Sequence, residues 1–132
     1  DCSLDAGDKP TKSGDFDALA NVKFESDSIV TVAYAKRGDS LFYGHGGAMM
    51  TKAPDAAARL LSITNNPFVE GFMTADHVEK YKGSLQAIDC TFEGWNAVLF
   101  ANSLTNKAYQ LHEYRYLAAA IYSRILEGDF AL

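Results

Sequence analysis

The sequence predicts an all-α protein, an up-down four-helix bundle with a short irregular N-terminal tail and one disulfide. Two series of apolar residues predict it, together with the short polar break between them. Steps that alternate between three and four residues place a series on one stripe of a helix, as in the seams of bundles and coiled coils. The first series is Val78, Tyr81, Leu85, Ile88, Phe92, Trp95 and Leu99, and the second is Leu111, Tyr114, Ala118, Ile121 and Ile125.

The break between the two series is polar and short, with Asn102, Ser103 and Thr105 in it. Two long amphipathic helices joined so closely are expected to pack antiparallel, and we expect them at 74–101 and 106–127. A competing pattern lies inside the first helix, because the apolar residues of 88–92 also alternate with polar ones as in a strand. That alternation covers only about six residues, so we interpret the segment as helix.

The first helix is expected at 15–37. Asp15 has the side chain of an N-cap, and Gly38 follows the basic residues of a helix C-terminus. Within this range residues 29–34 are rich in β-branched side chains and also fit a strand. The choice between helix and strand for 24–35 therefore stays open, and the helical character of the rest of the chain favours helix.

The second helix is expected at 40–63, broken near the glycines of 44–47 and at Pro54. A glycine cluster destabilises a helix by about 1 kcal/mol per residue, so it indicates a break, a close packing site or a hinge. It would also suit a flexible contact loop around His45, although a structural break is the more general explanation. Pro54 suits the first position of a helix, and Thr74 suits the N-cap of the next long helix.

The chain totals fit one globular domain. The 132 residues are 48% hydrophobic and carry a net charge of −5, which argues against nucleic-acid binding. No apolar run reaches the roughly 18–20 residues of a membrane-spanning helix. We expect residues 1–14 to be a flexible tail and 15–132 to be the bundle domain. The opening Asp1-Cys2-Ser3, without Met, is typical of a processed start, although a chosen segment boundary would look the same.

The two cysteines, Cys2 and Cys90, are too few for a four-cysteine zinc site and too far apart for Cys-x-x-Cys redox chemistry. A disulfide between them would tie the tail to the domain and contribute roughly 4–5 kcal/mol in the chain-entropy model. The alternative is two free thiols, with Cys90 a small buried hydrophobe. We favour the disulfide, which implies export to an oxidising compartment such as the periplasm or the extracellular space.

Motifs for catalysis or metal binding are not recognisable. His45, His77 and His112 have no partner at the spacings of helical metal sites, and neither a nucleophile elbow nor a phosphate loop is present. We therefore expect a protein that is not an enzyme and has no cofactor or metal.

The last helix carries the residues expected to bind a protein partner. Tyr and Arg are enriched at protein interfaces, and Tyr109 and Tyr116 lie one heptad apart and off the apolar seam. With His112 and Arg115 they would form an outward stripe for a macromolecular partner. Alternatively, the tyrosines cover neighbouring helices of the same bundle.

The run Tyr114-Arg115-Tyr116-Leu117 on the last helix, with the chain length and the bundle plan, resembles the PsbQ-like extrinsic subunits of photosystem II. That resemblance implies a thylakoid-lumen protein that docks on a membrane complex from the lumenal side and stabilises water oxidation without a metal of its own.

Two other functions are compatible with the sequence. One is a periplasmic toxin-neutralising (immunity) protein. The other is a carrier of a small apolar ligand, with a pocket of Phe42, Met49, Met50, Phe68, Phe72 and Met73.

Overall fold

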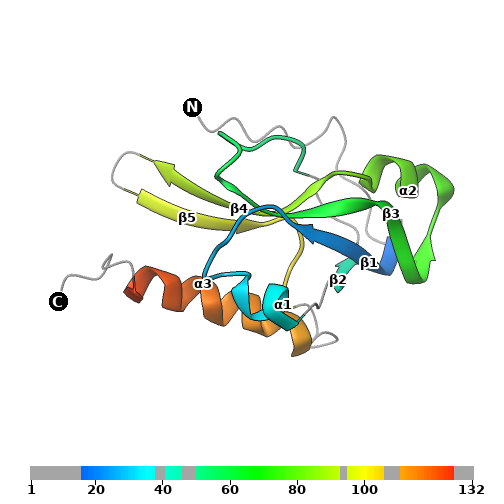
Figure 1. Ribbon diagram of the computed structural model, residues 1–132. Coiled ribbons are helices and arrows are strands. Elements are labelled where there is room, and N and C mark those ends of the chain that lie inside the picture. The colour runs from blue at the N-terminus through cyan, green and yellow to red at the C-terminus, as the bar shows by residue number, and fades with distance from the viewer. Residues whose placement is uncertain (1–15, 38–40, 46–49, 93–94, 106–110, 127–132) are drawn as a thin grey trace.

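A curled five-stranded antiparallel sheet forms the centre of the protein, with strand order β2-β1-β3-β4-β5 (Figure 1). The computed structural model describes residues 16–37, 41–45, 50–92, 95–105 and 111–126. The strands are β1 (Phe16–Phe24), β2 (Leu41–His45), β3 (Arg59–Met73), β4 (Leu85–Phe92) and β5 (Trp95–Phe100). The helices are α1 (Val32–Arg37), α2 (Ala75–Tyr81) and α3 (Tyr114–Leu126), with the 3-10 turn η2 (Leu111–Glu113) directly before α3.

The prediction of an all-α four-helix bundle is therefore wrong. The range 15–37 contains strand β1 before α1, the range 40–63 contains β2 and the start of β3, and the range 74–101 contains α2, β4 and β5. The resemblance to PsbQ-like subunits rested on the bundle plan, so it fails with it. The protein has instead a mixed α/β fold on an antiparallel sheet.

The long helix expected from Thr74 begins where predicted but is short. The Thr74 hydroxyl accepts the His77 backbone N–H at 3.4 Å as an N-cap. The helix ends at Tyr81, and Gly83 then adopts a φ of +69°, which turns the chain toward β4. The competing strand pattern was the correct one, because β4 and β5 pair along their lengths from Ala87↔Phe100 to Phe92↔Trp95. This hairpin satisfies backbone groups that a helix would have satisfied locally.

The outcome differs among the other predicted segments. The last helix is present as η2 and α3. The segment that was left open between helix and strand is divided, since β1 ends at Phe24 and α1 begins at Val32. Gly44 and His45 end strand β2, whereas Gly46 and Gly47 lie outside the described residues. The expected tail, residues 1–14, also lies outside them.

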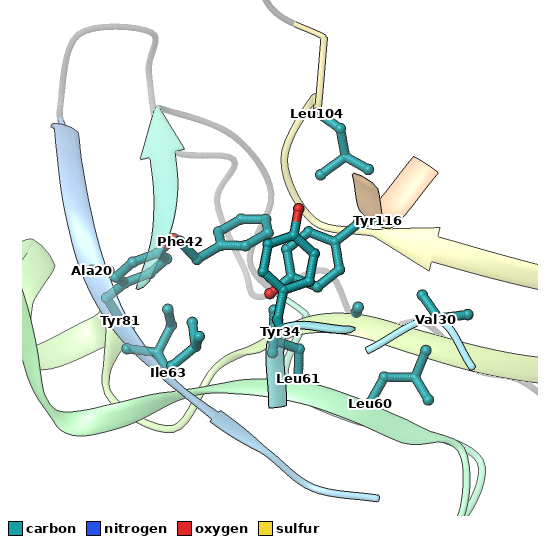
Figure 2. Close-up of a cluster of buried hydrophobic side chains, with 12 residues drawn as sticks. Ala20, Val30, Tyr34, Phe42, Leu60, Leu61, Ile63, Tyr81, Leu104 and Tyr116 are labelled. Atoms are coloured by element: carbon teal, nitrogen blue, oxygen red, sulfur yellow. The ribbon is translucent and has the colours of Figure 1, made fainter. Parts of the chain in front are cut away.

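The main core lies between one face of the sheet and the helices α1 and α3 (Figures 1 and 2). Strands β1, β2, β3 and β4 each contribute apolar side chains to this face, and both helices contribute a tyrosine. The buried members are Ala20, Val22, Val30, Tyr34, Phe42, Leu60, Leu61, Ile63, Tyr81, Ala87, Leu104 and Tyr116.

The opposite face of β4 is covered by the segment before β3. Met50 forms a bridge with Leu85, whose N–H donates to the Met50 carbonyl at 2.7 Å. Farther along, the Asp89 N–H donates to the Ala58 carbonyl at 2.8 Å. Met50 packs there with Ile88 and Cys90 in a second, smaller core. Strand β4 is therefore buried on both faces, which explains its high apolar content.

A buried polar network joins α2, β4 and the chain after β5. The Asn102 amide donates to Gln86 Oε1 at 2.7 Å, and the Tyr81 hydroxyl donates to the same oxygen at 3.2 Å. Burial raises the pKa of Tyr81, so its hydroxyl stays protonated as a donor. Buried polar groups that find partners in this way give the core one defined arrangement.

Strands β1 and β3 approach each other most closely at Gly71. This residue has a φ of +107°, and a Cβ built on it would overlap the Asp17 carbonyl oxygen and lie 2.8 Å from the Ala18 Cα. The register between the two strands also shifts near Leu19 and Ala20, which is typical of the bulges that bend a sheet. Glycine at 71 therefore permits the close pairing of the two longest strands.

We predict that Gly71→Ala lowers the free energy of unfolding by at least about 2 kcal/mol, because it adds a backbone clash to the strain of a positive φ. Gly83→Ala is the matched control. Gly83 also has a positive φ, but nothing lies within 4 Å of a Cβ there, so we expect a loss of only about 1 kcal/mol. Urea denaturation of both variants measures the difference, and equal losses would contradict the close approach at Gly71.

Candidate interaction site on helix α3

Helix α3 is fixed on the sheet by a tyrosine in its first turn. The Tyr116 side chain is fully buried, and its ring stacks on Tyr34 of α1 with a centroid distance of 4.0 Å (Figure 2). Phe42 of β2 and Phe100 of β5 approach the same ring at tilted angles. Aromatic contacts of this kind each contribute about 1 kcal/mol beyond area burial, so Tyr116 strongly favours one rotational setting of α3.

The N-terminal end of α3 is held by Glu113, which is only 2% exposed. Its carboxyl group accepts the backbone N–H of Tyr43 on the edge strand β2. Burial raises the pKa of this carboxyl from 4.5 to about 8, because the interior solvates its charged form poorly. Glu113 thus connects η2 to β2 and favours the neutral form at neutral pH.

The C-terminal end of α3 is held by an ion pair. Arg124 Nη2 lies 2.5 Å from Asp89 Oδ1 on β4, and both side chains are largely covered. Close to it, the buried Ser123 hydroxyl donates to the Ala120 carbonyl one turn earlier. With Glu113 and Tyr116, this pair sets which side of the helix faces the sheet.

The opposite side of α3 is apolar and exposed. The large side chains on this side, together with that of Leu111 in η2, have exposed fractions between 40% and 71%. They are Leu111, Leu117, Ile121, Tyr122, Ile125 and Leu126, and we call them the α3 outer face. The sequence of α3 has no acidic residue, and its charged residues are Arg115 and Arg124. A contiguous apolar face exposed on an ordered helix is typical of an interaction surface, so this face is suited to contact another molecule.

The second heptad series lies on this outer side. Ile121 and Ile125 are more than half exposed, and Ala118 is also exposed. The series was correctly placed on one stripe of a helix, but the stripe points away from the sheet. The core is formed instead by the side chains on the other side of the helix, chiefly Tyr116.

The residues predicted to bind a partner are separated by the structure. Arg115 is exposed at the start of the α3 outer face, whereas Tyr116 lies in the core. The backbone of His112 is in η2 with its side chain not described, and Tyr109 lies outside the described residues. The partner-binding role of these residues stays a prediction. Sequence reasoning missed the α3 outer face because it interpreted the heptad series as core, although the lack of acidic residues in α3 was a usable signal.

A cleft of about 760 Å³ lies near the C-terminal half of α3. Its walls include Asp27 after β1, Asp55 before β3, and Asp89 with Arg124. Cys90 lines it as well and is 1% exposed. The predicted Cys2–Cys90 disulfide is untested, because Cys2 lies outside the described residues.

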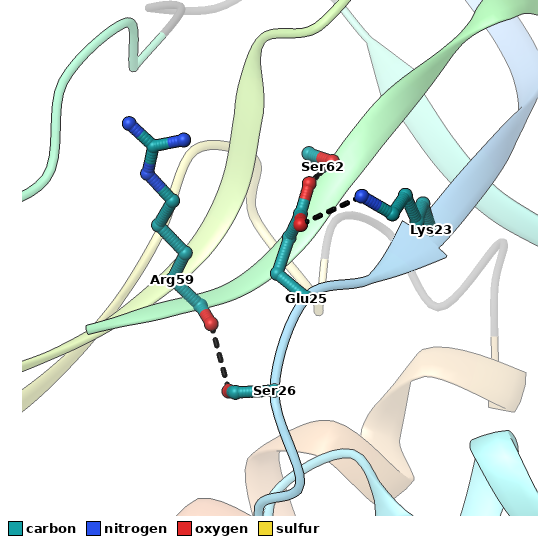
Figure 3. Close-up of polar contacts among 5 residues, drawn as sticks. All are labelled: Lys23, Glu25, Ser26, Arg59 and Ser62. Atoms are coloured by element: carbon teal, nitrogen blue, oxygen red, sulfur yellow. Dashed lines mark hydrogen bonds and ion pairs between the residues drawn. The ribbon is translucent and has the colours of Figure 1, made fainter. Parts of the chain in front are cut away.

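A polar cluster positions one rim of this cleft (Figure 3). Glu25 accepts hydrogen bonds from the Ser62 hydroxyl at 2.5 Å and from Lys23 at 2.9 Å, and the Ser26 hydroxyl donates to the Arg59 carbonyl at 2.7 Å. The Ser62 and Lys23 hydrogen bonds lower the pKa of Glu25. The cluster fastens the chain after β1 to β3, which is a structural role.

Other candidate groups do not converge. Within the described ranges no three His, Cys, Asp or Glu side chains are grouped so that they could hold a metal ion. His77 lies beside its own N-cap, with Nδ1 2.7 Å from the Thr74 hydroxyl. The described helices are all too short or too polar to cross a bilayer.

The residues expected to line an apolar pocket are spread over the molecule. Phe42 and Met50 belong to separate cores on opposite faces of the sheet, whereas Phe68 and Phe72 are exposed on β3. Met73 packs against the main core, and Met49 lies outside the described residues. The described members of this set therefore do not form one pocket.

Comparisons with protein-family models, with curated proteins and with solved structures find no match to this chain.

We predict that Glu113→Gln removes part of the pH dependence of stability. The raised pKa means that the folded state keeps a proton that the unfolded state loses between pH 4.5 and about 8. Because only the unfolded state loses this proton across the window, the free energy of unfolding falls by up to about 1.4 kcal/mol per pH unit. Above about pH 8 the carboxyl group is ionised in both states, so its contribution no longer changes with pH. Glutamine keeps the acceptor for the Tyr43 N–H and does not titrate.

Urea denaturation of both proteins at pH 5 and pH 8 checks this expectation. The wild type should lose stability relative to Glu113→Gln as the pH rises. Parallel changes in the two proteins would show that Glu113 does not titrate in this window.

Proposed function

We propose that this chain is a non-catalytic binding protein that docks against an apolar helix of another protein chain through the α3 outer face. One observation carries the proposal. The large apolar side chains of this face are exposed, although α3 is firmly anchored to the sheet on its other side. Exposed apolar patches on an ordered helix mark interaction sites, because leaving them in water is unfavourable.

The spacing of the outer face supports a helix as the partner element. Ala118, Ile121 and Ile125 continue the three-four alternation of a coiled-coil seam, which matches the surface of a second helix. Ala118 and Ala119 make the middle of α3 slim, so that another helix can approach closely. The non-catalytic part of the proposal rests on the sequence, which has none of the catalytic spacings considered above.

We predict that Ile125→Lys abolishes partner binding without unfolding the protein. Ile125 is 53% exposed, so the substitution should change the free energy of unfolding by less than about 0.5 kcal/mol. In the interface, however, it would place a charge against apolar side chains. Tagged wild-type and variant proteins are used to capture proteins from the source extract, and the captured protein is identified and its affinity measured after purification.

Phe72→Lys is the matched control, because Phe72 on β3 is 58% exposed and receives the same charge on a different element. The proposal requires a protein that the wild type and Phe72→Lys bind equally and Ile125→Lys does not. Equal binding by all three proteins would place the interface elsewhere. The identity of the captured protein also decides between stabilisation of a complex and neutralisation of a toxin.

Export to an oxidising compartment is a second part of the proposal, and it rests on the expected Cys2–Cys90 disulfide. The position of Cys90 is compatible with it, since Cys90 is among the residues that line the cleft, although its side chain is buried. We expect peptide mapping without reduction to recover Cys2 linked to Cys90, and reduction to lower the stability by at most roughly 4–5 kcal/mol. Alkylation of both thiols in unreduced, denatured protein would contradict the disulfide.

A further inference from the structure

We infer that the open edge of strand β5 binds an extended segment of a partner protein as one more strand of the sheet, with a basic side chain of that segment in the neighbouring cleft. This contact is separate from the α3 outer face. Three features carry it: the direction of the backbone groups along β5, the lack of the devices that usually protect an edge strand, and the charge of the cleft that reaches this edge.

Alternate backbone groups of β5 point away from β4. The N–H of Ala101, just after β5, donates to the Gln86 carbonyl at 2.9 Å. In an antiparallel ladder such hydrogen-bonded pairs alternate with pairs whose N–H and C=O groups point outward. The register of the hairpin places Phe100 and Val98 in the outward-pointing positions. The opposite strand shows the same alternation, because the Asp89 N–H donates to the segment before β3, on the other side of β4.

The outward backbone groups of Val98 and Phe100 have no hydrogen-bond partner in the described part of the chain. Strand β5 is the border of the sheet, with β4 as its neighbour (Figure 1). The side chains of Val98 and Phe100 pack against the main core, and Leu99 packs against the smaller core on the other face. Packing on both faces holds β5 in place while its edge stays open, so a pairing segment meets a preformed template.

The two edges of the sheet differ in their protection. Edge strands usually avoid pairing with other chains by means of charges, proline, bulges or a covering segment. On β2 the Glu113 carboxyl group covers the outward N–H of Tyr43. Strand β5 contains no charged residue and no proline, and its register with β4 is regular throughout. An uncharged and regular edge of this kind is the surface to which extended peptides add as strands.

The cleft of about 760 Å³ reaches this edge at Asn96, a residue of β5 that lines it. Among the described residues of its lining, the charged ones are three aspartates and Arg124. Arg124 is paired with Asp89, so the remaining charge comes from Asp27 and Asp55, which are both exposed. A segment paired with β5 would pass this cleft, where a lysine or arginine side chain is attracted and an acidic side chain is repelled.

Amide hydrogen exchange of the full chain tests the open edge without a ligand. After correction for intrinsic rates, we expect the amides of Val98 and Phe100 to exchange at least about tenfold faster than those of Ala97 and Leu99, which are bonded to β4. Equal protection of all four amides would show that the edge is already covered and would overturn the inference.

Defined peptides test the chemistry of the partner. The probe is a peptide of about ten residues that alternates valine and threonine, with a lysine at each end, and its matched control has glutamate in place of lysine. We expect the lysine peptide to bind about fivefold more tightly, because ion pairs at an exposed cleft contribute modestly. Its binding should protect the amides of Val98 and Phe100. The double variant Asp27→Asn and Asp55→Asn should remove the preference for lysine, and it should leave the fold intact because both side chains are exposed.

Backbone methylation of the lysine peptide tests whether it binds as a strand. Only every second N–H of a paired strand faces its neighbour. Methylation of one alternate set of peptide nitrogens should therefore abolish binding, whereas methylation of the other set should leave it nearly unchanged.

The remaining outcomes contradict the inference at separate points. Binding that survives methylation of either set would place the peptide away from the β5 edge. Equal binding of the lysine and glutamate peptides would exclude the basic side chain in the cleft. Protection of Val98 and Phe100 that grows with protein concentration in the absence of peptide would make a second copy of this chain the occupant of the edge. A lack of binding by both peptides, to a protein whose edge amides exchange rapidly, would overturn strand addition altogether.

Discussion

The stacking of Tyr116 on Tyr34 is the contact on which the arrangement of the helical layer depends. Both rings are buried between the sheet and the helices, and each comes from a different helix. Burying two aromatic side chains contributes several kcal/mol, which is large relative to the net stability of a domain. A rotation of α3 about its axis would separate the rings, so the contact also determines which residues of α3 face outward.

Polar contacts at the two ends of α3 also help to fix the rotation of the helix, and they differ in the free energy needed to remove their charged groups from water. The Arg124–Asp89 pair stays partly solvated and acts mainly through geometry. Glu113 is buried almost completely, so its favourable link to the Tyr43 N–H is offset by the cost of removing a carboxyl group from water. An apolar residue at this position would avoid that cost but would leave the Tyr43 N–H without this acceptor. The buried Glu113 carboxyl group is therefore explained better by its role in positioning and orienting α3 than by a gain in stability.

Local signals in the sequence were sufficient for some elements and not for others. Thr74 was recognised as an N-cap, and the last helix was recognised from its periodicity, since both features act within a few residues. The segment 85–92 was misinterpreted because Leu85, Ile88 and Phe92 match helical steps, although Ile88, Cys90 and Phe92 also alternate as in a strand. The neighbouring strand β5 pairs with this segment as a hairpin, but the other determinants are distant in sequence, namely the pairing with β3 and the cover provided by 50–58. Sheet pairing over long sequence distances has no local signature.

The candidate site was only half predictable for the same reason. The seam through Ile121 was visible in the sequence, but the bundle in which it was expected to pack is absent, and its contact with another helix stays a proposal. Which side of α3 would be buried depended on Tyr34 and Phe42, which are far from it in sequence. Tyr116, one of the four residues predicted to bind a partner, is a core residue. Ala118, Ile121 and Ile125, which looked like core, are exposed.

The place of α3 in the chain has a consequence for biosynthesis. The five described strands precede α3 in the chain, so they are synthesised, and leave the ribosome, before the helix that carries Tyr116. During that interval the apolar inner face of the sheet lacks most of its cover. Nascent chains with uncovered apolar surface are prone to aggregate and are substrates of chaperones. Until α3 docks, the strands that are already exposed therefore depend on protection from aggregation.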